Sequence, residues 1–198
     1  MSIFEDTAPR AVRHEPLRVA VLGASGSVGM QTLDVCRHFP QKVEVAALAV
    51  RSSVEFAVKA ATEFNCKYVA FADASVKGNA LLDSLPKGCK ASFGPEAVQA
   101  LAELDEVDCV VNAVVGEAGI YAGLAAVKAG KVLAYANKES IVVGGDLLMP
   151  LVKPGQLIPV DSEHSAIFQC LIGENPADIQ RIWLTCSGGL FFGYSREQ

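Results

Sequence analysis

A glycine-rich turn between two apolar segments constrains this chain more than any other feature. Residues Leu17–Leu22 form a short apolar run typical of a buried strand, and Ser27–His38 carry apolar residues at helical spacing. Glycines in such a strand–turn–helix unit let the backbone approach a pyrophosphate at the helix N-terminus. The turn reads Gly23-Ala24-Ser25-Gly26-Ser27-Val28-Gly29, a variant of the dinucleotide-binding fingerprint, so its backbone is a candidate pyrophosphate-binding site. The alternative is a glycine turn with a purely structural role.

Apolar runs alternate with helical patterns along the rest of the chain. We predict strands at Leu17–Leu22, Val43–Val50, Tyr68–Phe71, Val107–Val115, Lys131–Tyr135, Gln156–Val160 and Ile179–Cys186. We predict helices at Ser27–His38, Val54–Phe64, Asp73–Leu85, Pro95–Leu104, Gly116–Ala129, Ser140–Val152 and Ser165–Leu171. Alternation of this kind indicates βαβ units, so the predicted fold class is α/β, with a Rossmann-like, doubly wound, mostly parallel sheet.

A domain boundary is predicted at Met149–Pro154, where two prolines interrupt the pattern. The boundary would divide the chain into a flexible tail (residues 1–16), a dinucleotide-binding domain (17–150) and the beginning of a second α/β domain (151–198).

The composition excludes several classes of protein. Hydrophobic residues make up 51% and charged residues 20% of the 198 residues, which excludes a disordered chain. The net charge of −5 argues against nucleic acid or an anionic membrane as a partner. The stretch Met1–Pro16 lacks the apolar core of a signal peptide, and no apolar run is long enough to span a membrane. We expect a cytoplasmic protein whose six cysteines, none in a C-x-x-C pair, are reduced and mostly buried.

The end of the second predicted strand favours NADP over NAD. An NAD site usually places a carboxylate there to bind the ribose 2′-hydroxyl. This chain instead has Arg51 and Ser52, with no carboxylate before Glu55. A guanidinium group beside hydroxyls suits a 2′-phosphate. The alternative is that Arg51 is a solvated loop residue.

The segment Asn137-Lys138-Glu139 follows the strand predicted at Lys131–Tyr135. Ligands of open α/β sheets bind outside the carboxyl ends of the strands, so these side chains are placed to meet one. Asn137 could bind a nicotinamide amide, and Lys138 an anionic or hydroxylated substrate. The alternative is a helix start, with Asn137 as its cap and Glu139 in its first turn, and both readings can hold together.

Two carboxylates, Asp161 and Glu163, follow the strand predicted at Gln156–Val160. At i and i+2 on an extended segment they would project to the same side. A hard divalent cation, Mg²⁺ or Mn²⁺, would neutralise such a pair. The alternative is a pair of helix-capping residues, and for His164 we expect a supporting or structural role.

Taken together, these segments resemble the 1-deoxy-D-xylulose 5-phosphate reductoisomerase family. The resemblance covers nearly everything after Leu17 and is carried, in order, by Leu22-Gly23-Ala24-Ser25-Gly26-Ser27-Val28-Gly29, Asn112-Ala113-Val114-Val115-Gly116, Ala136-Asn137-Lys138-Glu139-Ser140, Pro159-Val160-Asp161-Ser162-Glu163-His164-Ser165-Ala166 and Ser187-Gly188-Gly189. The Asn-Lys-Glu-Ser and Asp-Ser-Glu-His segments at this separation are its most specific part.

The resemblance implies a role for each matching residue. NADPH would be bound by Gly23, Ser25, Gly26, Ser27, Val28, Arg51, Ser52, Asn137 and Glu139. Asp161 and Glu163 would hold the metal and, with Lys138, form the catalytic group. The substrate, a phosphorylated sugar, would be bound by Lys138, Ser162, Glu163 and Ser187. The implied reaction rearranges 1-deoxy-D-xylulose 5-phosphate and reduces the product with NADPH to 2-C-methyl-D-erythritol 4-phosphate, an isoprenoid precursor. A homodimer is implied for the full-length enzyme.

The sequence departs from the family in two respects. Leu190-Phe191-Phe192 differs from the usual residues after the serine-glycine-glycine segment. The chain also ends at Gln198, whereas family members are about twice as long, a length typical of two or more domains. We therefore expect a fragment or truncated product that binds the cofactor without catalysing.

Two other functions stay open at this point. One is a non-catalytic dinucleotide-binding module. The other is an NADP-dependent dehydrogenase of the semialdehyde dehydrogenase or dihydrodipicolinate reductase type, which would need a nucleophilic cysteine or a histidine-rich loop, and neither is evident in the sequence.

Overall fold

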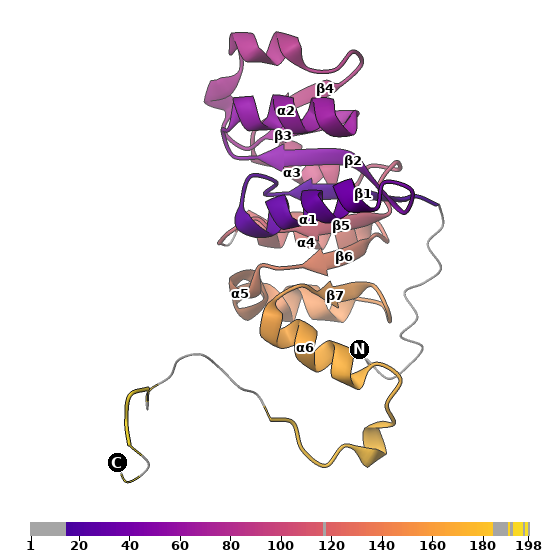
Figure 1. Ribbon diagram of the computed structural model, residues 1–198, viewed down its shortest axis with the longest axis vertical. Helices are drawn as coiled ribbons and strands as arrows, with labels where there is room; N and C mark the ends of the chain where they lie inside the picture. The colour runs from indigo at the N-terminus through magenta and orange to yellow at the C-terminus, as the bar shows by residue number, and fades with distance from the viewer. Residues whose placement is uncertain (1–14, 117, 184–189, 191, 196, 198) are drawn as a thin grey trace.

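The computed structural model describes residues 15–116, 118–183, 190, 192–195 and 197. A seven-stranded parallel sheet forms its centre, in the order β4-β3-β2-β1-β5-β6-β7 (Figure 1). The strands are β1 (Leu17–Leu22), β2 (Val43–Val50), β3 (Tyr68–Phe71), β4 (Lys90–Phe93), β5 (Cys109–Asn112), β6 (Val132–Tyr135) and β7 (Leu157–Pro159). The α-helices are α1 (Ser27–His38), α2 (Val54–Phe64), α3 (Pro95–Leu101), α4 (Ala118–Lys128), α5 (Lys138–Leu148) and α6 (Ser162–Leu171). The predicted Rossmann-like α/β fold is confirmed.

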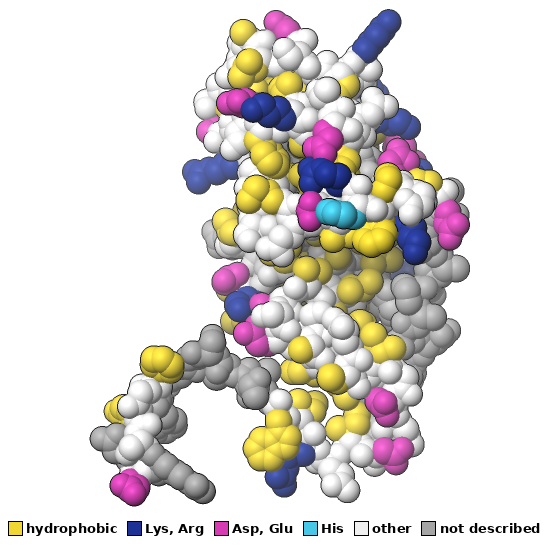
Figure 2. Space-filling model, viewed as in Figure 1, with side chains coloured by type: hydrophobic (Ala, Val, Ile, Leu, Met, Phe, Trp, Pro, Cys, Tyr) yellow, Lys and Arg dark blue, Asp and Glu magenta, His cyan; other side chains and the backbone are white. Residues whose placement is uncertain are grey.

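Helices cover both faces of the sheet because successive strand residues point in opposite directions. In β1, Val19 and Val21 pack in one cluster with α1 and α2, whereas Ala20 and Leu22 pack in the other with α3, α4 and α5. Figure 1 shows α1 and α2 in front of the sheet with α3 and α4 behind it. Figure 2 shows acidic and basic side chains interspersed over the front face. Among the described residues, no helix has the length and apolar character needed to cross a membrane.

The strand order reverses at β1, which pairs with β2 on one side and β5 on the other. The chain first builds outwards from β1 to β4 and then returns to build from β5 to β7. Leu22 at the end of β1 is level with Ala49 of β2 and Asn112 of β5. Crossovers that leave in opposite directions create a crevice at the carboxyl ends of β1 and β5, the usual ligand position in such sheets.

One segment predicted as a helix, Asp73–Leu85, forms two short 3₁₀ turns instead, η1 (Ala74–Val76) and η2 (Ala80–Ser84). The side chains of Asp73 and Asn79 each accept the backbone N–H two residues further on. Such local bonds compete with a continuous helix. Strand β4 was not predicted at all, because its four residues at the sheet edge include Lys90 and Ser92 and form no apolar run.

Other boundaries differ by a few residues. The strand predicted to reach Val115 ends at Asn112, and α6 begins at Ser162 instead of Ser165. Of the strand predicted at Ile179–Cys186, residues 179–183 have no regular secondary structure and the remainder lies outside the described residues. The domain boundary stays a prediction, while β7 beyond it continues the sheet by pairing with β6.

The described cysteines are free thiols. Cys36, Cys66 and Cys109 are buried, Cys89 is half-buried and Cys170 is exposed. Burial raises the pKa of the Cys66 thiol to about 12, so this side chain stays protonated and unreactive at neutral pH. The prediction of mostly buried thiols is confirmed for this part of the chain.

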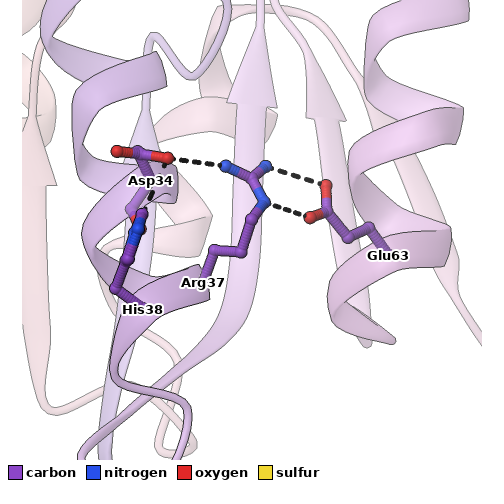
Figure 3. Close-up of polar contacts among 4 residues, drawn as sticks. All are labelled: Asp34, Arg37, His38 and Glu63. Carbon is purple, nitrogen blue, oxygen red and sulfur yellow. Dashed lines mark hydrogen bonds and ion pairs between the residues drawn. The ribbon is translucent and has the colours of Figure 1, made fainter.

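Two ion-pair arrangements differ in burial. Arg18 of β1 donates from its backbone N–H, its Nε and its Nη2 to the carboxylate of Asp108, which directly precedes β5. Their side chains are 24% and 12% exposed, and the hydrogen bond to Asp108 raises the pKa of Arg18. On the surface, Arg37 of α1 bonds both Asp34 and Glu63, the latter from α2 (Figure 3). The first pair joins two central strands, whereas the second joins two exposed helix faces.

Replacing Asp108 by Asn should therefore destabilise the fold, because an amide cannot accept all the bonds that Arg18 donates. Hydrogen bonds to charged groups contribute roughly 1.5–3 kcal/mol. We expect a clearly lower urea midpoint for Asp108→Asn. The control Glu63→Gln weakens an exposed pair, so its midpoint should hardly move. Equal midpoints in the two variants would contradict this assignment.

Candidate functional site

The glycine turn lies at the switch point of the sheet. Its first residue, Gly23, has a positive φ of 81°. The backbone N–H groups of Gly23 and Ala24 both donate to the carbonyl of Ala49, at 3.0 and 2.9 Å. A Cβ atom on Gly23 would lie 2.5 Å from the carbonyl oxygen of Ala113, which follows β5. Glycine is therefore required where the turn, β2 and the segment after β5 meet.

The turn leads directly into the N-terminus of α1. The cap residue Gly26 offers no side-chain acceptor, and the first turn contains no acidic residue. Gly26 and Ser27 are exposed, and Ser25 and Val28 are half-buried. The first N–H groups of a helix have no partner within the helix and carry its positive dipole end. The arrangement can bind a phosphate group, as predicted for these residues.

A cation lies at the carboxyl end of β2, as the sequence predicts. Arg51 and Ser52 are both exposed there. The sequence analysis missed Asp73, whose backbone N–H donates to the carbonyl of Arg51 at 2.9 Å. Hydrogen bonds from Ser75 and, to a smaller degree, the charge of Arg51 lower the pKa of Asp73. An anion that binds Arg51 would thus approach the carboxylate of Asp73 as well. The sequence could have indicated Asp73, because it lies just after the next strand, β3.

The predicted catalytic residues Lys138, Asp161 and Glu163 come together beyond the ends of β6 and β7. Lys138 Nζ lies 3.1 Å from Asp161 Oδ2, and the Asp161 side chain is 11% exposed. The hydrogen bond to Asp161 raises the pKa of Lys138, and the charge of Glu163 adds to the effect. Burial acts to raise the pKa of Asp161, but the bonds from Lys138 and from the His164 N–H outweigh it, and the net shift is downward.

The geometry of the carboxylate pair differs from the prediction. Glu163 does not lie on an extended segment, because α6 begins at Ser162 and Glu163 is in its first turn. Asp161 is the cap of this helix and accepts the backbone N–H of His164. The capping role left open as an alternative is confirmed, and His164 Nδ1 lies 3.3 Å from Asp161 Oδ1. Ser162 Oγ donates to Glu163 Oε2 at 2.6 Å, so the predicted substrate-binding serine belongs to the same cluster.

The cluster offers oxygen ligands of the kind that Mg²⁺ and Mn²⁺ prefer. Asp161 and Glu163 could each contribute a carboxylate. Within the described residues, no group of three or more His, Cys, Asp or Glu side chains is arranged to hold a metal ion. Further ligands would have to come from water or from a bound substrate. Ser187, predicted to bind substrate, lies outside the described residues.

A groove of about 460 Å³ runs beside this cluster. Its lining includes Ser162, Glu163, apolar residues of α6, Arg181 and Trp183. The Arg181 guanidinium lies 5.2 Å from the centre of the Trp183 ring, within the range of a cation–π contact. The groove thus combines a carboxylate and a hydroxyl group with apolar walls.

Asn137 is buried at the start of α5, where Lys138 and Glu139 are exposed. Its side-chain oxygen accepts the N–H of Ser140, so the predicted helix start is confirmed. Its side-chain nitrogen donates to the carbonyls of Val114 and Gly116. The sequence analysis assigned no role to the buried residues around it, which are Asn112, Tyr135 and Ser140.

Two family models match the chain. Residues 19–145 match 1-deoxy-D-xylulose 5-phosphate reductoisomerase, and residues 157–198 match 1-deoxy-D-xylulose 5-phosphate reductoisomerase C-terminal domain. The 1-deoxy-D-xylulose 5-phosphate reductoisomerase of Thermodesulfovibrio yellowstonii is 43% identical over 178 residues, which cover 89% of this chain and 46% of the relative. That of Pelodictyon phaeoclathratiforme is 45% identical over 185 residues, which cover 91% and 48%. The chain spans about half the length of these curated relatives.

Solved structures give the same result. The 1-deoxy-D-xylulose 5-phosphate reductoisomerase from Zymomonas mobilis, in complex with NADPH, superposes with a TM-score of 0.73 at 40% identity and covers 79% of this chain and 41% of that one. A DOX-P reductoisomerase structure with fosmidomycin and magnesium superposes with a TM-score of 0.79 at 35% identity and covers 92% and 48%.

The packing of the glycine turn predicts opposite outcomes for two helical glycines. A Cβ atom on Gly29 would lie 2.6 Å from the Cα of Ala24, whereas one on Gly145 would meet its nearest neighbour, Ile141, at 3.8 Å. Gly29→Ala should displace the turn and lower stability. Gly145→Ala should raise stability by roughly 0.5–1 kcal/mol, because alanine restricts the unfolded chain. Thermal unfolding of both variants measures the difference, and a stabilised Gly29→Ala variant would refute the described packing.

Proposed function

The chain belongs to the 1-deoxy-D-xylulose 5-phosphate reductoisomerase family, and we propose that it forms the NADPH-binding part and the beginning of the catalytic part of such an enzyme. The reaction would convert 1-deoxy-D-xylulose 5-phosphate to 2-C-methyl-D-erythritol 4-phosphate. One observation carries the proposal: the glycine turn, Arg51 and the Lys138–Asp161 pair all lie beyond the carboxyl ends of strands in one parallel sheet. A dinucleotide and a substrate bound there would lie side by side along the edge of the sheet formed by the carboxyl ends of its strands.

We propose residues 17–150 as the dinucleotide-binding domain and 151–198 as the start of the catalytic domain. The two separate family matches, 19–145 and 157–198, support the division. A homodimer of the full-length enzyme is proposed from the family resemblance.

In the cofactor site, the pyrophosphate of NADPH would bind the backbone at Gly23, Ser25, Gly26, Ser27 and Val28. Support comes from the uncapped N-terminus of α1. Arg51 and Ser52 would bind the 2′-phosphate, because both are exposed at the end of β2. Glu139, exposed in the first turn of α5, would face the cofactor from the other half of the sheet.

In the catalytic site, Asp161 and Glu163 would hold Mg²⁺ or Mn²⁺. When bound, the metal would supply Lewis-acid polarisation of the substrate oxygens. Lys138 already lies against Asp161 and would place its ammonium group beside an anionic or hydroxylated substrate, with Ser162 and Ser187 as further hydrogen-bonding groups. The Asp161 carboxylate is held in place by His164 of α6, through the backbone N–H and the nearby Nδ1 of that residue.

A narrower function is proposed for the chain by itself, namely binding of NADPH without turnover. The observation that favours it is that the described cluster contains two carboxylates and no third ligand of this kind. Hard cations usually bind more oxygen atoms than these two residues supply, from protein or substrate. Mixing the chain with NADPH, Mn²⁺ and 1-deoxy-D-xylulose 5-phosphate, and following absorbance of the reduced cofactor, tests this proposal. Robust turnover would show that the chain holds a complete catalytic site.

For the cofactor, we predict tighter binding of NADPH than of NADH. Arg51→Ala should weaken NADPH binding at least about tenfold, since a charge-assisted contact contributes roughly 1.5–3 kcal/mol, and should leave NADH binding unchanged. Fluorescence titration measures both dissociation constants. Lys128→Ala makes the same change of charge at the end of α4, and it should alter neither. Equal affinity of the unmutated chain for the two cofactors would contradict the assignment of Arg51.

For the metal, we predict that Asp161→Asn abolishes Mn²⁺ binding and leaves NADPH binding nearly intact. The amide oxygen of asparagine can still cap α6, so the variant removes the charge and keeps the helix start. Electron paramagnetic resonance measures free Mn²⁺ in the presence of NADPH. The control is Asp146→Asn, which changes an exposed carboxylate on α5. Unchanged Mn²⁺ affinity in Asp161→Asn would place the metal elsewhere.

A further inference from the structure

The segment that follows β5 is held by a side chain from a different crossover. Residues 113–116 run from the end of β5 towards α4, beside the glycine turn. The Nδ2 group of Asn137 donates to two carbonyls of this segment, those of Val114 and Gly116 (2.6 Å to the latter). Asn112 also acts on the segment, since its Oδ1 accepts the Val114 N–H and its Nδ2 donates to the Gly119 carbonyl at 2.7 Å. Two buried amides thus fix its path.

The donor capacity of Asn137 is fully used by these contacts. An asparagine amide has two N–H donors, and the carbonyls of Val114 and Gly116 each accept one of them. Its Oδ1 accepts the Ser140 N–H at 3.1 Å, which also fixes the orientation of the amide. The residue is only 4% exposed. A nicotinamide carboxamide would therefore find no free donor on this side chain.

Asn137 is itself held from behind. Ser140 Oγ lies 3.2 Å from the Asn137 carbonyl and 2.6 Å from the hydroxyl of Tyr135, and both side chains are buried. A Cβ atom on Gly119 would lie 2.7 Å from Asn137 Nδ2, so a glycine is needed where α4 passes the amide. A buried network whose polar groups are all hydrogen-bonded favours a single arrangement of its side chains, so it rigidifies residues 113–116.

The segment faces the part of the crevice where the nicotinamide half of the cofactor would lie. The 2′-phosphate end is proposed at β2 and the pyrophosphate at the glycine turn, so the remaining nucleotide extends across β1 towards β5 and β6. The side chain of Val115 is 86% exposed on this segment, although valine is usually buried. An exposed apolar side chain at this position suits the face of a nicotinamide ring.

We infer that Asn137 is a positioning residue for the nicotinamide half of the dinucleotide, acting through the backbone of residues 113–116 and supported by Ser140 and Tyr135. The inference rests on the proposed NADPH function. In this proposal the side chain of Asn137 bonds only to protein groups, and the nicotinamide ring contacts the backbone of residues 113–116 and the side chain of Val115.

The test compares two ligands on Asn137→Asp. Aspartate keeps the acceptor that caps α5 and removes both donors to the segment. NADPH should bind about tenfold more weakly, the usual effect of losing a buried hydrogen-bonding group. Binding of 2′-phospho-ADP-ribose, which lacks the nicotinamide, should be nearly unchanged. The control Asn79→Asp makes the same substitution at an exposed cap and should alter neither affinity.

Three results would overturn the inference. Equal weakening of both ligands would mean that Asn137 merely stabilises the fold, and an unchanged NADPH affinity would mean that the segment does not position the ring. Failure of the unmutated chain to bind 2′-phospho-ADP-ribose would overturn the proposed cofactor function and this inference together.

A second measurement needs no substitution. In the unmutated, isotope-labelled chain, the side-chain amide protons of Asn137 should exchange slowly with water before NADPH is added, because both are bonded to backbone carbonyls. Rapid exchange before addition would show that the amide is free to contact the nicotinamide and would overturn the inference.

Discussion

The site depends on one close approach, that of the Gly23 turn to the carbonyl of Ala113. The two segments follow neighbouring strands, β1 and β5, whose crossovers leave in opposite directions. A Cβ atom on Gly23 would lie 2.5 Å from that carbonyl, so any other residue would push the two strand ends apart. This contact places the start of α1 beside residues 113–116. A glycine that looks like a phosphate-binding device in the sequence is thus equally a packing device.

Charge is arranged differently on the two halves of this edge. On the β1 and β2 side, positive potential comes from backbone N–H groups and the exposed Arg51. On the β6 and β7 side, a half-buried carboxylate, Asp161, is compensated by Lys138. Removing Lys138 would leave that carboxylate without its ammonium partner, which is costly in a half-buried position. The lysine thereby compensates the charge of the acidic cluster.

The sequence predicted the elements whose signals are local and strong. From Leu17 to Phe71, five consecutive elements have the predicted bounds, because each strand is a mostly apolar run and each helix has a clear apolar periodicity that stops before Pro40 or at Asn65. Two of the failures share one cause, which is side-chain capping. Asp73 and Asn79 divert the chain into 3₁₀ turns, and Asp161 starts α6 three residues early. Capping residues read as ligands or as helix interiors until the hydrogen bonds are seen. The pairing of Lys138 with Asp161 joins distant segments, so it required the sheet order.

A related consideration explains why the buried residues Asn112, Tyr135 and Ser140 were given no role from the sequence. Asn112, Asn137 and Ser140 lie within apolar surroundings, and in the described part of the chain no buried side-chain nitrogen or oxygen lacks a hydrogen-bond partner. Asn137, whose two N–H donors are both used within the protein, has no donor left to offer a ligand. Recognition at this edge would therefore fall to groups that the fold leaves open: backbone N–H groups at the start of α1, the exposed Arg51, and the carboxylates at the start of α6. The buried amides instead fix residues 113–116 and the start of α5, so the network and the binding groups have separate tasks.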